Sequence, residues 1–158
     1  INVYSEVGKG TTFKVYLPTT QTVEVVGDEK AEIPVGNGEL ILVVDDEMSI
    51  RETTKASVEK YNYHALTASD GIEAIALYAQ YKNEISPILI DMMMPEMDGV
   101  TTIRTLQRIN PQVKIIAVSG LATNDRVSTA INSGAKSFLP KPYTTEELLR
   151  QLHQVLNS

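Results

Sequence analysis

From residue 39 onward, short runs of apolar residues alternate with longer stretches in which apolar positions recur every three or four residues. The short runs are typical of buried β-strands and the longer stretches of amphipathic helices. The predicted strands are residues 40–44, 63–68, 87–92, 113–120 and 136–140. The predicted helices are residues 48–60, 70–82, 98–109, 122–134 and 144–156. This alternation predicts an α/β fold, a doubly wound five-stranded parallel sheet with five helices.

Local signals mark the ends of several of these helices. Asp70 is a favoured N-cap residue, and Thr144 and Glu147 have the spacing of a capping box. Gly134 follows a helical stretch at a position where a left-handed C-cap is common. The Asp98-Gly99 pair is expected to form a turn and the start of a helix.

The first part of the chain has a different pattern. Residues 1–17 contain two runs of β-branched and aromatic residues around a glycine-rich turn at 8–10, which predicts a β-hairpin. Residues 18–38 are polar and acidic, with several glycines and prolines, and predict a linker. A single hairpin is marginally stable alone. We therefore expect residues 1–17 to be the remnant of a domain that this chain mostly lacks, ahead of one complete domain over 39–158.

The composition argues against several kinds of partner and site. The 158 residues carry a formal net charge of −6, and no basic stripe is present, so a nucleic-acid partner is not expected. There is no cysteine, which excludes disulfides, zinc–thiolate sites and thiol catalysis. No apolar run approaches the roughly 20 residues that span a bilayer, so no membrane contact by this segment is predicted.

Polar residues gather at the ends of the predicted strands. Asp45 and Asp46 follow the first strand, and Asp91 lies at the end of the third. Ser119 ends the fourth strand, and Lys141 follows the fifth. Functional groups of open parallel sheets collect beyond the carboxyl ends of the strands. The sequence therefore predicts one site with three acids, a hydroxyl and an ammonium group.

Three neighbouring carboxylates repel one another, and a hard divalent cation relieves the conflict. Mg²⁺ prefers oxygen ligands and keeps several waters. We expect Asp46 and Asp91 to be direct ligands, Asp45 to bind directly or through water, and the main-chain carbonyl of Met93 to supply a further oxygen.

A carboxylate beside Mg²⁺ can also act as a nucleophile that forms an aspartyl phosphate. Asp91 is the candidate, because it comes from the central strand and the other groups flank it. Lys141 would neutralise phosphoryl oxygens, and Ser119 would donate a hydrogen bond to one of them.

Four separated segments, LILVVDDE, ILIDMMMPEMDG, IIAVSG and FLPKPY, make residues 39–158 similar to the receiver domain of two-component response regulators. The resemblance implies a flavodoxin-like sheet with strand order 2-1-3-4-5. It implies that Asp91 is the phosphoacceptor, which takes a phosphoryl group from phosphohistidine, and that Asp45 and Asp46 are the acidic pair that holds Mg²⁺.

The resemblance also implies a switch. Ser119 corresponds to the switch hydroxyl, Lys141 to the invariant lysine and Phe138 to the aromatic residue that turns inward on activation. The Lys141–Pro142 bond is expected to be cis. Ser at 119 and Phe at 138 are the less common alternatives in the family.

The segment SEVGKGTTFKVYLP resembles the last hairpin of a histidine-kinase ATP-binding domain, and the order of the parts is that of a hybrid histidine kinase. The chain itself lacks the other kinase motifs, and His64 and His153 do not lie in a phosphoacceptor box. The resemblance implies a histidine kinase or a histidine phosphotransfer domain as partner. It allows a homodimer through the fourth helix, fifth strand and fifth helix, and it implies a cytoplasmic location, with or without a tether to a membrane-bound parent kinase.

The sequence is also compatible with two other functions. The first is a metal-dependent phosphohydrolase with an aspartyl nucleophile, although such enzymes place their acids after the first strand two residues apart and add a cap insertion. The second is a receiver that binds partners without being phosphorylated. A simpler interpretation of Asp45 is an N-cap for the helix that follows.

Overall fold

The computed structural model describes residues 1–16, 33–120 and 123–158. The chain divides into two compact units, Ile1–Glu32 and Ile33–Ser158. The elements of the second unit are β3 Leu40–Val44, α1 Met48–Glu59, β4 His64–Ala68, α2 Gly71–Gln80, β5 Ile85–Asp91, α3 Gly99–Ile109, β6 Ile115–Ser119, α4 Asn124–Ser133, β7 Ser137–Pro140 and α5 Thr145–Leu156. None of the described helices is long and apolar enough to cross a membrane.

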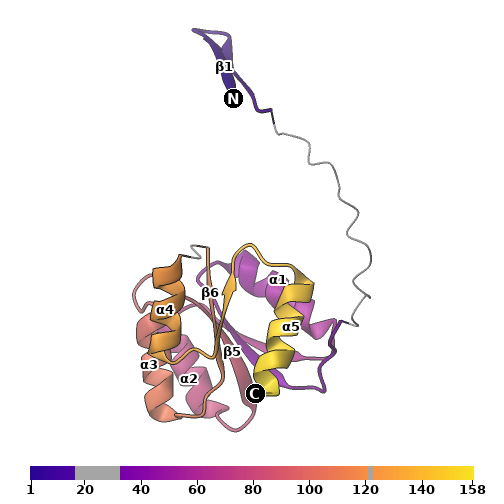
Figure 1. Ribbon diagram of the computed structural model, residues 1–158, viewed down its shortest axis with the longest axis vertical. Helices are drawn as coiled ribbons and strands as arrows, with labels where there is room; N and C mark the ends of the chain where they lie inside the picture. The colour runs from indigo at the N-terminus through magenta and orange to yellow at the C-terminus, as the bar shows by residue number, and fades with distance from the viewer. Residues whose placement is uncertain (17–32, 121–122) are drawn as a thin grey trace. The chain divides into compact units, whose positions relative to one another are not determined.

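The strands of the second unit form one sheet in the order β4-β3-β5-β6-β7, and every neighbouring pair is parallel. Counted within this unit, that is the predicted order 2-1-3-4-5. Helices α2, α3 and α4 cover one face of the sheet, and α1 and α5 cover the other (Figure 1). The predicted doubly wound, flavodoxin-like fold is confirmed.

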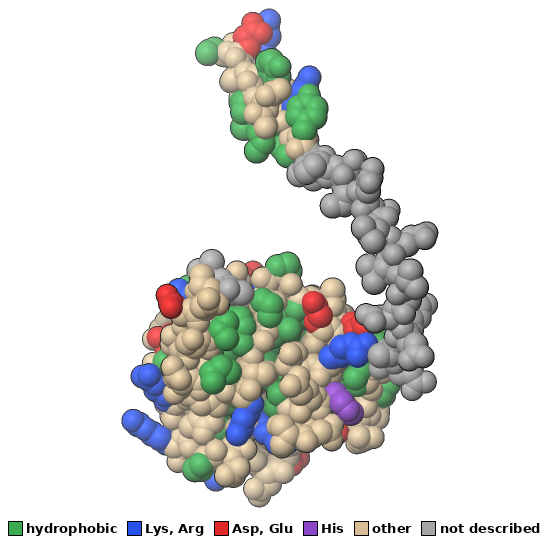
Figure 2. All heavy atoms as spheres, in the orientation of Figure 1, with side chains coloured by type: hydrophobic (Ala, Val, Ile, Leu, Met, Phe, Trp, Pro, Cys, Tyr) green, Lys and Arg blue, Asp and Glu red, His purple; other side chains and the backbone are tan. Residues whose placement is uncertain are grey.

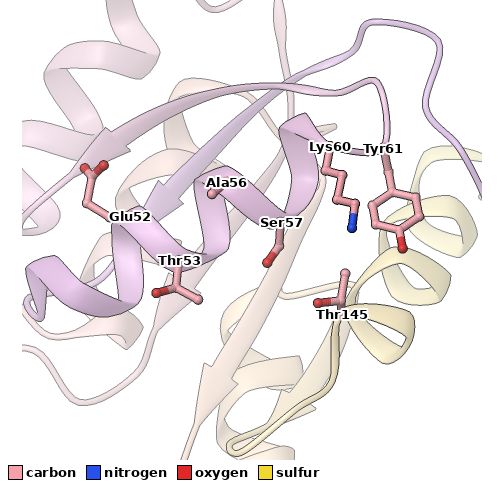
Figure 3. A pocket seen from close by; sticks show the side chains of 7 residues that line it. All are labelled: Glu52, Thr53, Ala56, Ser57, Lys60, Tyr61 and Thr145. Atoms are coloured by element: carbon pink, nitrogen blue, oxygen red, sulfur yellow. The ribbon is translucent and has the colours of Figure 1, made fainter.

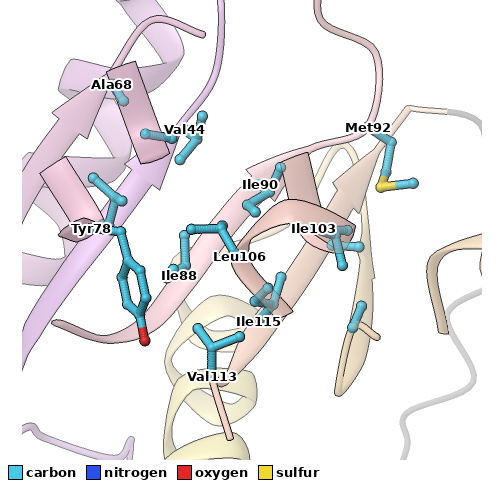
Figure 4. Packing of buried hydrophobic residues seen from close by; sticks show 14 of the residues in the cluster. Val44, Ala68, Tyr78, Ile88, Ile90, Met92, Ile103, Leu106, Val113 and Ile115 are labelled. Atoms are coloured by element: carbon cyan, nitrogen blue, oxygen red, sulfur yellow. The ribbon is translucent and has the colours of Figure 1, made fainter. Parts of the chain in front are cut away.

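Each face of the sheet has its own hydrophobic core. On the α2–α4 face, fully buried Ile88 and Ile90 of β5 pack with Ile103 and Leu106 of α3 (Figure 4). On the other face, side chains of β3, β5 and β6 pack against Leu148, Leu149, Leu152 and Val155 of α5. Burial on both faces is the reason why the strands are nearly continuous apolar runs.

Strand β5 begins at Ile85, two residues before the predicted start, and contains Pro87. The register against β3 shifts at this point, since Leu40 pairs with Ile85 but Leu42 pairs with Ile88. Proline has no N–H to donate to a ladder, and bulges are where strands accept it. The irregularity therefore lets an internal strand contain a proline.

Residues 33–38, predicted as the end of the linker, pack against the rest of the second unit. The backbone N–H groups of Gly36 and Gly38 donate to the carbonyls of Tyr61 and Asn62 at 2.8 and 2.9 Å. The Asn62 side chain donates to the Gly36 carbonyl at 2.7 Å. A Cβ on Gly36 would lie 2.5 Å from the Tyr63 ring. The second compact unit begins at Ile33. Residues 18–32 of the predicted linker, and residue 17 of the predicted hairpin segment, lie outside the described residues.

The first unit contains the predicted hairpin, with β1 Asn2–Glu6 and β2 Gly10–Lys14 paired antiparallel. Val3 lies opposite Phe13 in this ladder. Both side chains are exposed, at 54% and 67%. Hydrophobic side chains are visible on the surface of this unit (Figure 2). Such a hairpin leaves apolar area in water that a larger domain would cover.

The helix-end predictions are largely confirmed. Asp70 and Asp98 accept N-cap hydrogen bonds, Thr144 and Glu147 form the capping box, and Gly134 is a left-handed C-cap with φ of 112°. The N-cap interpretation of Asp45 is wrong, because the N-cap of α1 is Glu47, which makes no side-chain cap hydrogen bond.

Gly99 lets the start of α3 approach the end of β5. A Cβ at this position would lie 2.6 Å from the Asp91 carbonyl oxygen and 2.7 Å from Met92 Cα. Real side chains do not tolerate such contacts with backbone, so the glycine permits the close packing that fixes the main chain of Asp91.

Candidate functional site

The three predicted acids meet at the carboxyl edge of the sheet. One carboxylate oxygen from each of Asp45, Asp46 and Asp91 lies within 4.8 Å of the other two. Asp45 and Asp91 are buried, with 3% and 7% of their surface exposed, while Asp46 is exposed. Strands β3 and β5 are hydrogen-bonded neighbours, so their ends place these acids side by side.

Lys141 joins two of the acids. Its Nζ donates to Asp45 Oδ2 at 2.6 Å and to Asp91 Oδ2 at 2.8 Å. The second oxygens accept main-chain hydrogen bonds, Asp45 Oδ1 from the Glu47 N–H and Asp91 Oδ1 from the Met93 N–H. Each buried carboxylate is thus bound on one side by its own loop and on the other by the lysine.

The protonation of Lys141 follows from these contacts. Burial lowers its pKa, but the hydrogen bonds to Asp45 and Asp91 and the negative charges of both acids outweigh burial, so its pKa lies above the ordinary value. Lys141 is therefore a cation at neutral pH and can neutralise a charged group that approaches Asp91.

Ser119 is fully buried at the end of β6. Its carbonyl accepts a hydrogen bond from the Lys141 N–H at 2.8 Å, which connects the ends of β6 and β7. Phe138 is partly buried and packs against the core on the α2–α4 face. The Lys141–Pro142 bond is cis, as the resemblance implied, and so is Ser86–Pro87.

The donor set fits a magnesium ion. Mg²⁺ binds oxygen at about 2.1 Å, so two oxygens on opposite sides of one ion lie about 4.2 Å apart. Carboxylate oxygens within 4.8 Å of one another reach such positions with small side-chain rotations, and water supplies the remaining ligands. Met93 follows Asp91 at a distance of two residues in the chain, in a loop that turns back toward the cluster through its N–H.

Sequence reasoning missed two sets of contacts beside the cluster. The Nη1 atom of Arg51 donates to the main-chain carbonyls of Asp45 and Asp46. The Tyr143 hydroxyl lies 3.2 Å from Thr54 Oγ1 and so connects the loop after β7 to α1. A cation near the N-terminus of a helix opposes the helix dipole, and this feature of Arg51 was the signal available in the sequence.

Two hollows lie along α1. One, of about 470 Å³, adjoins the cluster, because Lys141 lines it together with Ile50, Thr54 and Tyr143. The other, of about 520 Å³, lies between α1 and the first residue of α5, Thr145 (Figure 3). None of the three clustered acids lines the second hollow, so it is separate from the site chemistry.

Comparison with protein families decides the assignment. The family described as the response regulator receiver domain matches residues 41–153. The chain belongs to this family. Receiver domains act in two-component signalling, are phosphorylated on an aspartate and typically bind Mg²⁺ at an acidic pocket. Membership of this family favours a receiver over the phosphohydrolase alternative.

Curated relatives include single receivers and a longer kinase. Chemotaxis protein CheY of Thermotoga maritima is 34% identical over 119 residues, which cover 75% of this chain and 98% of that protein. Sensor kinase CckA of Brucella abortus is 34% identical over 163 residues, which cover 96% of this chain and 17% of CckA. The response regulator MprA of Mycobacterium sp. (strain KMS) is 33% identical over 73% of this chain, and the alignment spans 50% of MprA.

Solved structures agree with the fold. A response regulator receiver domain protein from Clostridium thermocellum aligns with a TM-score of 0.72 and 30% identity, over 75% of this chain and 94% of that one. The CheX–CheY–BeF3–Mg+2 complex from Borrelia burgdorferi aligns with a TM-score of 0.72 and 26% identity, over 75% of this chain and 89% of that one.

Proposed function

We propose that Asp91 of this receiver accepts a phosphoryl group from a phosphohistidine, with Mg²⁺ held by Asp45, Asp46, Asp91 and the Met93 carbonyl. The observation that carries the proposal is the placement of Lys141 Nζ, within 2.8 Å of both buried carboxylates. A cation and a metal-binding set of acids then converge on one carboxylate at the end of the central strand.

The chemistry follows from this arrangement. An oxygen of Asp91 attacks the phosphorus, the P–N bond of the phosphohistidine breaks, and the imidazole leaves with the bonding electron pair. Catalysis of phosphoryl transfer consists mainly of positioning and charge stabilisation. Lys141 supplies charge on one side of the phosphoryl oxygens, and Ser119 supplies a hydroxyl donor. Mg²⁺, when bound, neutralises the remaining developing charge.

Phosphorylation adds a charge of about −2 beside these groups. In the proposed switch, the Ser119 hydroxyl moves toward the phosphoryl group and Phe138 turns inward to fill the space. Phe138 is partly buried in the present structure and packs against the core on the α2–α4 face. The surface formed by α4, β7 and α5 then changes, and we propose this surface for a homodimer or for the next partner.

The proposal extends to a hybrid histidine kinase as parent protein. The CckA alignment covers 96% of this chain, so it continues past the receiver into the first unit. The apolar side chains exposed on the hairpin are expected of the last strands of a domain that is otherwise absent here. On this proposal residues 1–17 belong to the kinase ATP-binding domain, residues 18–38 contain the linker, and the parent protein is cytoplasmic or tethered to the membrane. The phosphodonor is then a histidine kinase or a histidine phosphotransfer domain.

Beryllium fluoride tests the acceptor and separates it from a binding-only receiver, because this compound mimics a phosphoryl group without turnover. Calorimetric titration with beryllium fluoride in the presence of Mg²⁺ should show binding to the parent chain. Asp91→Asn should show none, and the parent should show none with EDTA. Absence of binding to the parent under all conditions would support the binding-only alternative instead.

A further inference from the structure

The guanidinium of Arg51 contacts the acidic loop at its main chain. Its Nη1 atom donates to the Asp45 carbonyl at 2.6 Å and to the Asp46 carbonyl at 3.0 Å. Arg51 is the fourth residue of α1 and is partly buried. One side chain therefore joins the first helix to both acids that follow β3.

The loop has few other restraints. The Asp45 N–H still pairs with the Ala68 carbonyl at 3.2 Å, but the chain leaves the sheet after this bond. The N-cap residue Glu47 makes no side-chain cap hydrogen bond. Among the described residues, no other side chain donates to the carbonyls of Asp45 and Asp46. Within the loop, the Asp45 carboxylate accepts a hydrogen bond from the Glu47 N–H. Arg51 adds a side-chain restraint from α1 that acts on the carbonyls of both acids.

The position of the charge matters as well as the hydrogen bonds. Arginine is a cation in proteins, so Arg51 brings a positive charge to the main chain of two of the three acids, whose carboxylates repel one another. It binds carbonyl oxygens and occupies none of the carboxylate oxygens that would bind a metal ion. Lys141 differs, because it binds the carboxylates themselves.

We propose that Arg51 is a positioning residue for the divalent cation: by holding both carbonyls, it orients Asp45 and Asp46 toward Asp91 and raises the affinity for Mg²⁺. This inference rests on the proposed function of the cluster. When a residue that orients a metal ligand through a hydrogen bond is replaced, the affinity for the metal typically falls 10- to 100-fold. Arg51 affects binding of the ion rather than the chemistry of transfer, so its loss should be compensated by excess Mg²⁺.

The test uses the full chain and three variants. Arg51→Gln removes the charge and the fork of donors, and Arg51→Lys keeps the charge but offers a compact point donor in place of the planar fork. The control is Arg108→Gln, the same charge change at an exposed position in the last turn of α3. Thermal unfolding in EDTA establishes that each variant is folded. If Arg51→Gln does not fold, the inference is tested with Arg51→Lys alone.

Calorimetry gives the Kd for Mg²⁺, and intact mass gives the rate of phosphorylation by acetyl phosphate. We expect a Kd raised by about tenfold or more in Arg51→Gln and by several-fold in Arg51→Lys, with no change in Arg108→Gln. At saturating Mg²⁺ all variants should be phosphorylated within about twofold of the parent rate.

An Arg51→Gln or Arg51→Lys chain with the parent's Kd would overturn the inference and leave the proposed function intact. So would a loss of phosphorylation rate in Arg51→Gln that persists at saturating Mg²⁺, since Arg51 would then act in the chemical step. A parent chain that binds no Mg²⁺ would overturn the proposed function and this inference together.

Discussion

Lys141 Nζ donates to Asp91 Oδ2 over 2.8 Å, although the two residues come from the ends of β7 and β5, which are separated in the sheet by β6. The same ammonium reaches Asp45 at 2.6 Å. Side chains of all three groups are less than a fifth exposed. The lysine therefore compensates two buried negative charges before any metal or phosphoryl group arrives.

Lys141→Met should destabilise the metal-free protein by about 3 kcal/mol, because the removal of one partner from a buried ion pair leaves uncompensated charge. Mg²⁺ should then raise the stability of the variant more than that of the parent, since the ion replaces the missing cation. Urea unfolding with EDTA and with Mg²⁺ measures both effects. The control is Lys136→Met at an exposed position, and equal unfolding of Lys141→Met and the parent would contradict the prediction.

Gly99→Ala should lower the free energy of unfolding by about 2 kcal/mol, because the new Cβ would overlap the main chain of Asp91 and Met92 and force a backbone shift. The phosphorylation rate should fall as well, since Asp91 moves with the backbone. Urea unfolding and intact mass measure the two effects. Gly120→Ala is the control for stability, because a Cβ there meets no atom within 4 Å among the described residues other than its chain neighbours. Similar losses in both variants would refute the packing argument.

The hydrogen bond between the partly buried hydroxyls of Tyr143 and Thr54 should contribute about 1 kcal/mol to stability, as is usual for an intramolecular hydrogen bond. A double-mutant cycle with Tyr143→Phe and Thr54→Val measures this coupling by urea unfolding. Because Tyr143 follows Lys141 by two residues, the bond also restrains the lysine loop against α1. Strictly additive effects of the two substitutions would show that the hydroxyls do not stabilise one another.

The N-cap of α3 gives stability a defined pH dependence. The Thr101 backbone N–H, which donates to the Asp98 carboxylate at 2.7 Å, holds the pKa of Asp98 below its ordinary value. A lowered pKa in the folded state means that the contribution is complete above the unfolded-state pKa and is lost as the pH falls through the folded-state pKa. Asp98→Ala should therefore destabilise the protein by about 1 kcal/mol at pH 7.

This difference between parent and Asp98→Ala should shrink as the pH falls from 7 to about 3, in the direction of the ordinary pKa of aspartate and below it. Urea unfolding at a series of pH values measures the difference, and Asp98→Asn should retain most of the cap across the series. A stability difference between the parent and Asp98→Ala that grows as the pH falls would contradict the prediction.

Residues 33–38 should stabilise the receiver. A chain that begins at Glu39 loses two main-chain hydrogen bonds and the bond from Asn62, and should be less stable by about 1–2 kcal/mol than a chain that begins at Ile33. Thermal and urea unfolding of the two chains test this expectation. Equal stabilities would mean that the segment only continues the linker.

Much of the fold could be predicted from the sequence, because elements that are buried in the core show a regular pattern of apolar residues. The apolar runs gave the strands, and Asp70, Asp98 and Gly134 marked helix ends through chemistry local to each residue. The start of β5 could not be placed, because Pro87 is tolerated only through a register shift against β3, and a register is a property of two strands.

For the site, too, some residues could be predicted from the sequence and others could not. Asp45, Asp91 and Lys141 could be placed together because parallel strands end at one edge. The position of Arg51 near a helix N-terminus was a signal, but its acceptors, and that of the Asn62 amide, could not be predicted, because every residue has a main-chain carbonyl. The packing of residues 33–38 was hidden for the same reason, because its hydrogen bonds are mostly between main-chain groups.

Whether Asp91 is a magnesium-dependent phosphoacceptor can be measured by intact mass after incubation with acetyl phosphate and Mg²⁺. We expect one added phosphoryl group on the parent chain, none with EDTA in place of Mg²⁺, and none on Asp91→Asn. An adduct that persists on Asp91→Asn, or one that forms equally well without a divalent cation, would contradict the assignment of Asp91 as a magnesium-dependent phosphoacceptor.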